Sequence, residues 1–138
     1  METIKNYKSY NENKSIEELQ FNLLQDINNL EHLKLELEFY KFLLEKPIFK
    51  IHVINLYERL SDFKHDIQSL DSKRVALLND IYLHSNHIEQ KIECDDMACD
   101  AFFIHEHDAV ALRIFEFNQK VKAFKFNFFQ YLESVFIN

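Results

Sequence analysis

The sequence predicts an all-α protein, an elongated antiparallel three-helix bundle with coiled-coil-like seams and an up-down-up course. Three observations support this fold class. The 138 residues include no glycine and a single proline, Pro47, so the residues that favour tight turns and hairpins are almost missing. Apolar residues recur every three or four positions through three long segments. The phase of this pattern changes at Pro47 and restarts after Asp96, which divides the chain into three helices.

The composition fits one globular domain, with 47% hydrophobic and 28% charged residues. The formal net charge of −7 argues against a nucleic-acid binder, because neutralising phosphates needs a basic face. The first residues are polar, and no stretch reaches the roughly 18 apolar residues of a membrane span. We therefore expect a cytoplasmic protein without a signal peptide, consisting of a polar N-terminal tail at 1–14 and a single helical bundle domain at 15–138.

The first helix is predicted at about 15–46. Ser15 and Glu18 have the spacing of a capping box, in which the serine hydroxyl bonds the Glu18 amide and the glutamate reaches back. The helix is expected to end before Pro47, because a residue that precedes proline disfavours the helical conformation. Its apolar face consists of Ile16, Leu19, Leu23, Ile27, Leu30, Leu33, Leu37, Tyr40 and Leu44.

The second and third helices are predicted at about 48–93 and 97–136. In the break between them, Asp95 or Asp96 has the side chain needed to cap the third helix, and Cys94 and Cys99 are expected to be free thiols. The second seam consists of Val53, Leu56, Leu60, Phe63, Ile67, Leu70, Arg74, Leu77, Ile81, His84 and Ile88. The third consists of Phe103, His107, Val110, Ile114, Phe117, Val121, Phe124, Phe128, Tyr131 and Val135.

Three polar residues interrupt these apolar seams. If the second and third helices fold back at the break, His84 faces His107 in one layer of the bundle. Arg74 is expected to stack on aromatic rings or to reach a carboxylate such as Glu18 or Glu116. All three residues are expected to have a structural role, because a buried polar residue can fix the register of packed helices.

A metal site is the alternative for the histidine layer. His84, His87 and His107 lie near one another in this arrangement, with Asp80 and Asp108 close in sequence, and imidazole and carboxylate groups suit zinc or a similar transition metal. A pH-sensitive layer is a further alternative. The paired Glu-x-x-His motifs of di-iron bundles and the HExxH motif are absent, as is any recognisable nucleophile motif, so the sequence does not indicate an enzyme.

The third helix carries phenylalanines outside its seam, notably Phe115, Phe126, Phe129 and Phe136. One interpretation is that these rings pack against both other helices of the bundle. The other is a surface for a second copy or a protein partner, since large exposed apolar patches mark interaction sites. We expect a homodimer, because a slender bundle has little interior and isologous pairing is the commonest closed assembly.

The leading functional interpretation is a non-enzymatic helical interaction or scaffold module that self-associates and needs no cofactor. Metal binding by the histidine layer is the first alternative. The second is a peripheral membrane module, because Lys120, Lys122 and Lys125 alternate with phenylalanines as in interfacial helices. Three lysines are few, however, and they can instead complement the acidic first helix.

Overall fold

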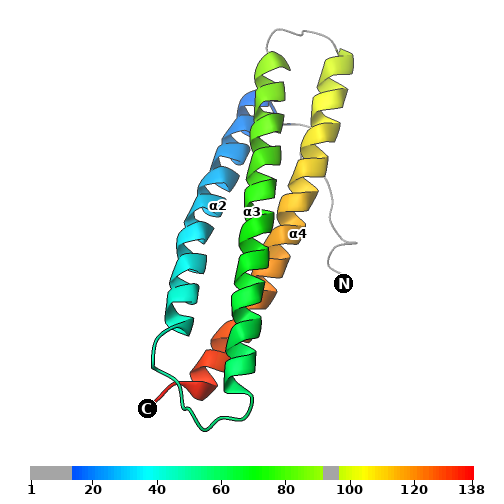
Figure 1. Cartoon of the computed structure of the whole chain (residues 1–138). Helices are drawn as coiled ribbons and strands as arrows, with labels where there is room; N and C mark the ends of the chain where they lie inside the picture. Colours follow the sequence, from blue (N-terminus) through cyan, green and yellow to red (C-terminus); the bar gives the residue numbers. More distant parts are fainter. Residues whose placement is uncertain (1–13, 92–96) are drawn as a thin grey trace.

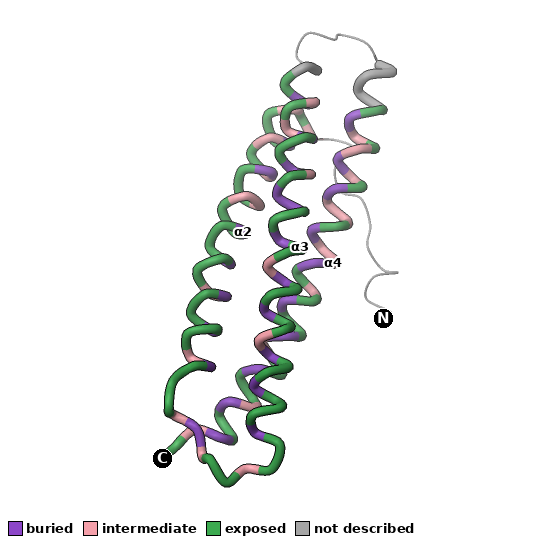
Figure 2. The backbone as a smooth tube through the Cα atoms, in the orientation of Figure 1, coloured by how far each residue is buried: buried purple, intermediate pink, exposed green. Residues whose placement is uncertain are grey.

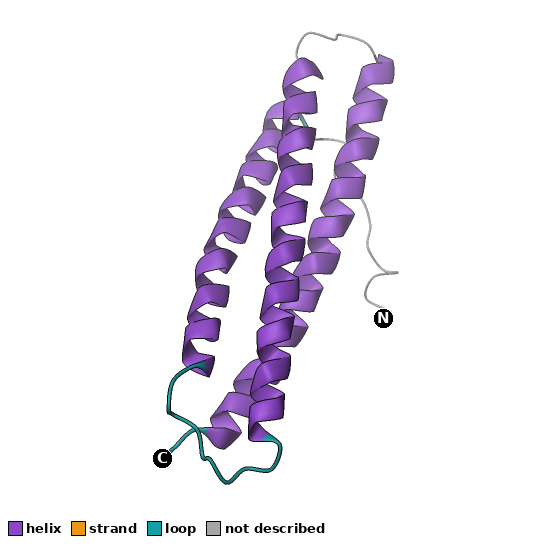
Figure 3. Ribbon diagram, viewed as in Figure 1, coloured by secondary structure: helices purple, strands orange, loops and turns teal. Residues whose placement is uncertain are grey.

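The computed structural model describes residues 14–91 and 97–138, with side chains up to 89 and from 102. Within these residues the chain forms three helices, α2 (Ile16–Leu44), α3 (Leu56–Lys91) and α4 (Met97–Val135). Successive helices are antiparallel, running down, up and down in Figure 1, and α3 packs against both α2 and α4. The rest of the described chain is loop, with one isolated bridge (Figure 3). The predicted three-helix bundle is confirmed.

The helix α2 begins where the capping pattern predicts. Ser15 has extended backbone angles, and its hydroxyl accepts a hydrogen bond of 3.2 Å from the Glu18 amide. Two glutamates in the first turn complement the positive end of the helix dipole. The helix ends at Leu44, two residues before the predicted limit, and Glu45 caps it by donating its amide to the Phe42 carbonyl at 3.2 Å.

The second helix begins later than the predicted range of 48–93, because α3 starts only at Leu56. Residues 45–55 form turns instead, and Asn55 has a φ of 61°, in the left-handed region that a helix interior cannot contain. The carbonyl of Asn55 then accepts the first helical hydrogen bond, from the Arg59 amide at 2.9 Å. Pro47 reverses the chain as expected, but the loop that follows it, 48–55, takes up as many residues as about two helical turns.

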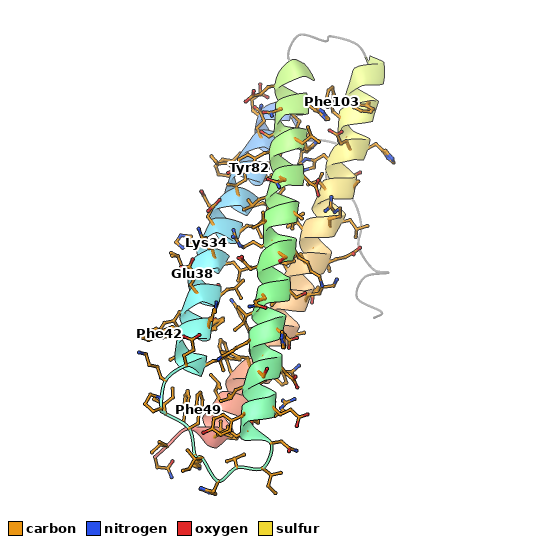
Figure 4. The ribbon with its side chains drawn as sticks, in the orientation of Figure 1. Lys34, Glu38, Phe42, Phe49, Tyr82 and Phe103 are labelled. Carbon is orange, nitrogen blue, oxygen red and sulfur yellow. The ribbon has the colours of Figure 1, made fainter. Side chains whose placement is uncertain are left out.

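The loop before α3 is fastened to the C-terminal end of α4. Two backbone hydrogen bonds, Lys50 to Val135 and Ile137 to Ile48, are each 2.8 Å long. Between them Phe49 and Phe136 form an antiparallel bridge, and their rings stack with centroids 5.8 Å apart. Phe49 lies at the lower end of the bundle in Figure 4, near the loop that connects α2 to α3. This pairing explains why residues 45–55 are ordered without being helical.

The core follows the three predicted seams, which appear as buried stripes facing the bundle interior in Figure 2. It includes a group of aromatic rings where all three helices meet. Phe128 of α4 is fully buried and lies 5.1 Å from Tyr40 of α2 and 5.2 Å from Phe63 of α3, measured between ring centroids. Phe124 stacks on Phe128 at 5.1 Å. Edge-to-face and tilted pairs of this kind stabilise a core beyond simple burial.

None of the described helices contains an apolar stretch long enough to cross a bilayer.

Replacing Phe128 by alanine is expected to lower the free energy of unfolding by about 3–5 kcal/mol, because the substitution leaves a cavity among three helices. Phe126 is the matched control, since it lies two residues before Phe128 on the same helix and is 62% exposed. Phe126→Ala is expected to change stability by about 0.5 kcal/mol or less. Urea unfolding followed by circular dichroism measures both values. Equal losses in the two variants would contradict the aromatic core described above.

Candidate functional site

Polar side chains occur at three positions in the described core, Arg74, His84 and His107, which are 4%, 2% and 4% exposed. These are the residues that interrupt the predicted seams. His84 lies on α3 and His107 on α4, and the antiparallel register brings the two rings together. His84 Nε2 and His107 Nδ1 are 3.1 Å apart, within hydrogen-bonding distance. The structure therefore places both histidines in one layer.

Glu106 completes this layer. Its Oε1 lies 2.5 Å from Nδ1 of His84, and both carboxylate oxygens lie 3.0 Å from Nδ1 of His87. Burial acts to raise the pKa of Glu106, but hydrogen bonds from the two histidines and their charges outweigh it, so this pKa lies below its ordinary value. An ionised carboxylate is an acceptor only, so His84 and His87 both donate to it from Nδ1.

These contacts order the protons along the layer. When the His84 ring is neutral and donates from Nδ1, its Nε2 accepts a hydrogen bond from the N–H group at Nδ1 of His107. The pKa of His107 is lowered to about 4, chiefly by burial and then by the charge on His84, with Lys14 adding to the effect and Asp108 opposing it. His107 is therefore neutral at physiological pH. The layer is a hydrogen-bonded chain from Glu106 through His84 to His107.

Of the two carboxylates predicted near the histidines, Asp108 acts on His107 through its charge, whereas Asp80 has a different partner. Asp80, one helical turn before His84, instead forms an ion pair with Arg113 across the α3–α4 contact. Glu106 was missed although it adjoins His107 in sequence. The signal that identifies it is the same antiparallel register that pairs His84 with His107, because this register also brings Glu106 opposite His84 and His87.

Arg74 has a different partner from those considered in the sequence. Its Nε donates to Oδ1 of Asp71 at 2.9 Å, one turn earlier on α3, rather than to Glu18 or Glu116. The carboxylate of Asp71 is 46% exposed, so the pair links a buried guanidinium to solvent. This contact pairs the buried Arg74 charge with a residue of the same helix, so no other helix is needed to neutralise it.

Zinc binding at His84, His87 and His107 stays a prediction. Among the described residues, no group of three or more histidine, cysteine, aspartate or glutamate side chains is arranged to hold a metal ion. Both ring nitrogens of His84 are within hydrogen-bonding distance of other side chains, so a metal there requires these contacts to be rearranged. The side chains of Cys94 and Cys99 lie outside the described residues.

The four phenylalanines predicted as a partner surface divide into two groups. Phe126 and Phe129 are 62% and 48% exposed, although the Phe129 ring also contacts Tyr40 of α2 edge-on at 5.6 Å. Phe115 and Phe136 are half-buried, and Phe136 stacks on Phe49 within the chain. The exposed part of this surface is therefore Phe126 with one side of Phe129.

Stability is expected to respond to pH through His107. Because its pKa is about 4 in the folded protein and 6.5 ordinarily, the unfolded chain binds a proton that the native state excludes between these values. The contribution of His107 to the free energy of unfolding is therefore lost as pH falls from 6.5 toward 4. Burial also raises the pKa of Asp26 to about 6, which has the opposite sign in part of this window.

The comparison that isolates His107 is between the wild-type protein and His107→Gln, both of which keep Asp26. Urea unfolding at several pH values between 7 and 4 gives the two stability curves. The wild-type curve is expected to fall more steeply than that of the variant. Parallel curves would mean that His107 is not excluded from protonation in the native state.

Replacing Glu106 by glutamine is expected to lower the free energy of unfolding by about 1–3 kcal/mol, because it removes a charged acceptor shared by two imidazoles, one of them buried. Glu89→Gln, at an exposed position on α3, is the matched control and is expected to leave stability nearly unchanged. Thermal and urea unfolding at neutral pH measure both. A Glu106 variant as stable as the control would contradict a structural role for the carboxylate.

No protein-family model matches the chain, and no curated protein or solved structure is significantly similar to it.

Proposed function

We propose that this chain is a non-enzymatic helical interaction module that self-associates. The observation that carries the proposal is the number of large apolar side chains that the bundle leaves at its surface. All three helices contribute side chains that are about half exposed or more, in addition to a complete buried seam. On the helices these are Phe21, Leu24, Leu35, Phe39, Phe42, Tyr57, Val75, Tyr82, Leu83, Phe102, Phe126 and Phe129.

Aromatic residues dominate this exposed set, and they are the residues that contribute most to protein interfaces. Helices also present such side chains on rigid backbones, so little conformational entropy is lost on binding. Self-association is the simplest use, since a closed pair of identical subunits covers the same surface twice. The geometry of the bundle thus supports an interaction role.

The other two interpretations receive less support from the described contacts. In the histidine layer, carboxylate and imidazole groups already satisfy one another. Among the lysines considered for membrane binding, Lys125 donates to both oxygens of Glu36 on α2, at 3.0 and 3.1 Å. It serves as a link between helices, which leaves a weaker basic surface for anionic lipids.

The expected result in solution is a mass that rises with protein concentration toward that of a dimer. Multi-angle light scattering after size exclusion, and sedimentation equilibrium at several loading concentrations, measure it. Affinity purification of the tagged chain from a lysate checks for a different protein partner. A monomer at every concentration, with no partner recovered, would contradict the interaction role.

A further inference from the structure

The helix α2 has two apolar faces on opposite sides. One is its buried seam. The other, which we call the outer stripe, faces away from α3 and α4. At about 100° per residue, its members fall within a sector of about 60°. The outer stripe consists of Phe21, Leu24, Leu35, Phe39 and Phe42, which are 58%, 55%, 62%, 55% and 52% exposed. Figure 2 shows exposed residues along this side of α2, and Figure 4 shows Phe42 projecting away from the bundle.

The outer stripe is symmetric along the helix. Its midpoint lies between Glu31 and His32, both of them exposed polar residues. Moving outward from this point, Leu24 mirrors Phe39 and Phe21 mirrors Phe42, whereas the position that mirrors Leu35 is the polar Asn28. A second α2 laid across the stripe in the opposite direction, with the midpoints superimposed, therefore brings apolar side chains together in the two outer pairs. The pairs formed are Asn28 with Leu35, Leu24 with Phe39, and Phe21 with Phe42.

The two ends of the outer stripe carry opposite charges at positions that obey the same symmetry. Glu17 lies on this side of the first turn of α2. At the other end, the ammonium group of Lys46 lies over the Phe42 ring, 4.2 Å from its centroid. Antiparallel pairing brings Glu17 of one copy to Lys46 of the other at both ends and aligns the helix dipoles favourably. Parallel pairing would instead bring like charges together.

We infer that the outer stripe of α2 binds the outer stripe of a second copy of this chain, antiparallel and in this register. The inference rests on the proposed self-association and names its surface. Five apolar side chains that each expose about 100 Å² give about 500 Å² per copy. Two stripes then bury about 1,000 Å², and the polar rim brings the total to the roughly 1,200 Å² of the smallest stable interfaces.

The centre of the outer stripe is polar, so the charges at its two ends set the direction of pairing. Asn28 lies in line with the apolar residues, next to the polar midpoint. Opposite Leu35, Asn28 finds no hydrogen-bond partner across the pair, so it lowers affinity. The exposed Glu31 and His32 beside it keep this part of the stripe open to water. An unrelated helical partner would not need this symmetry.

A pair of charge substitutions tests the register. Leu24→Glu and Phe39→Lys each place a charge opposite an apolar side chain, and each is expected to raise the dimer dissociation constant by about thirtyfold. The double variant places glutamate opposite lysine twice in the antiparallel dimer, and its dissociation constant is expected to return to within about fivefold of wild type. Sedimentation equilibrium measures all four proteins. Both positions are exposed, so circular dichroism is expected to show unchanged folding.

Phe126→Glu is the matched control, because Phe126 is as exposed as the residues of the outer stripe but lies on α4. It is expected to leave the dissociation constant unchanged. A dimer that Phe126→Glu disrupts and Leu24→Glu does not would overturn this inference while leaving the proposed self-association intact. A wild-type monomer at all concentrations would overturn both. Weakened single variants without recovery in the double variant would overturn the register.

Spin-label distances give an independent measurement of orientation. With Cys94→Ser and Cys99→Ser as background, single labels are introduced as His32→Cys, near the midpoint, or Glu45→Cys, near the end of α2. In the antiparallel dimer the two labels at position 32 lie close together, whereas those at position 45 are separated by about 40 Å along the helix axes. Short distances at both positions would indicate parallel pairing and overturn the inference.

Discussion

The packing of the Phe128 ring against its neighbours is the interaction on which the rest of the bundle depends. It is the point where side chains of α2, α3 and α4 meet, through Tyr40, Phe63 and Phe124. Because helices are stiff and rise about 1.5 Å per residue, fixing α4 against α3 at one place fixes their register along their whole length. His84 and His107 lie several turns away at the other end of this contact. Their hydrogen bond therefore depends on the register that the aromatic rings impose.

The sequence predicted the interior of the bundle well because burial follows helical periodicity. The polar residues in the seams were identified as buried by position alone, since Arg74 and His84 occupy regular places in the second stripe. The start of α3 was predicted too early. Val53 continues the spacing of the stripe, so periodicity could not reveal that the loop before α3 pairs with the end of α4. That pairing joins residues far apart in sequence, which a local pattern does not encode.

The candidate site was predicted in part for the same reason. Facing histidines follow from an antiparallel fold, but the choice of carboxylate depends on the rotation of α4 about its axis. Asp80 and Glu106 are both close to the histidines in sequence or register, and only the rotation decides that Asp80 meets Arg113 while Glu106 meets His84. The outer stripe of α2 was overlooked because the buried seam already explained the helix. A helix with two apolar faces satisfies the criterion for a core element and still leaves a complete surface unpaired.

The order of the helices has a further consequence for how the chain folds. The hairpins α2–α3 and α3–α4 are formed by neighbours in sequence, whereas α2 meets α4 through residues as distant as Glu36 and Lys125, 89 positions apart. Contacts between sequence neighbours form early, since less chain entropy is lost in closing them. We therefore expect docking of α2 onto α4 to be the late event. Opening this boundary away from the Phe128 ring leaves both hairpins intact, so exchange of backbone amides with solvent is expected to begin there.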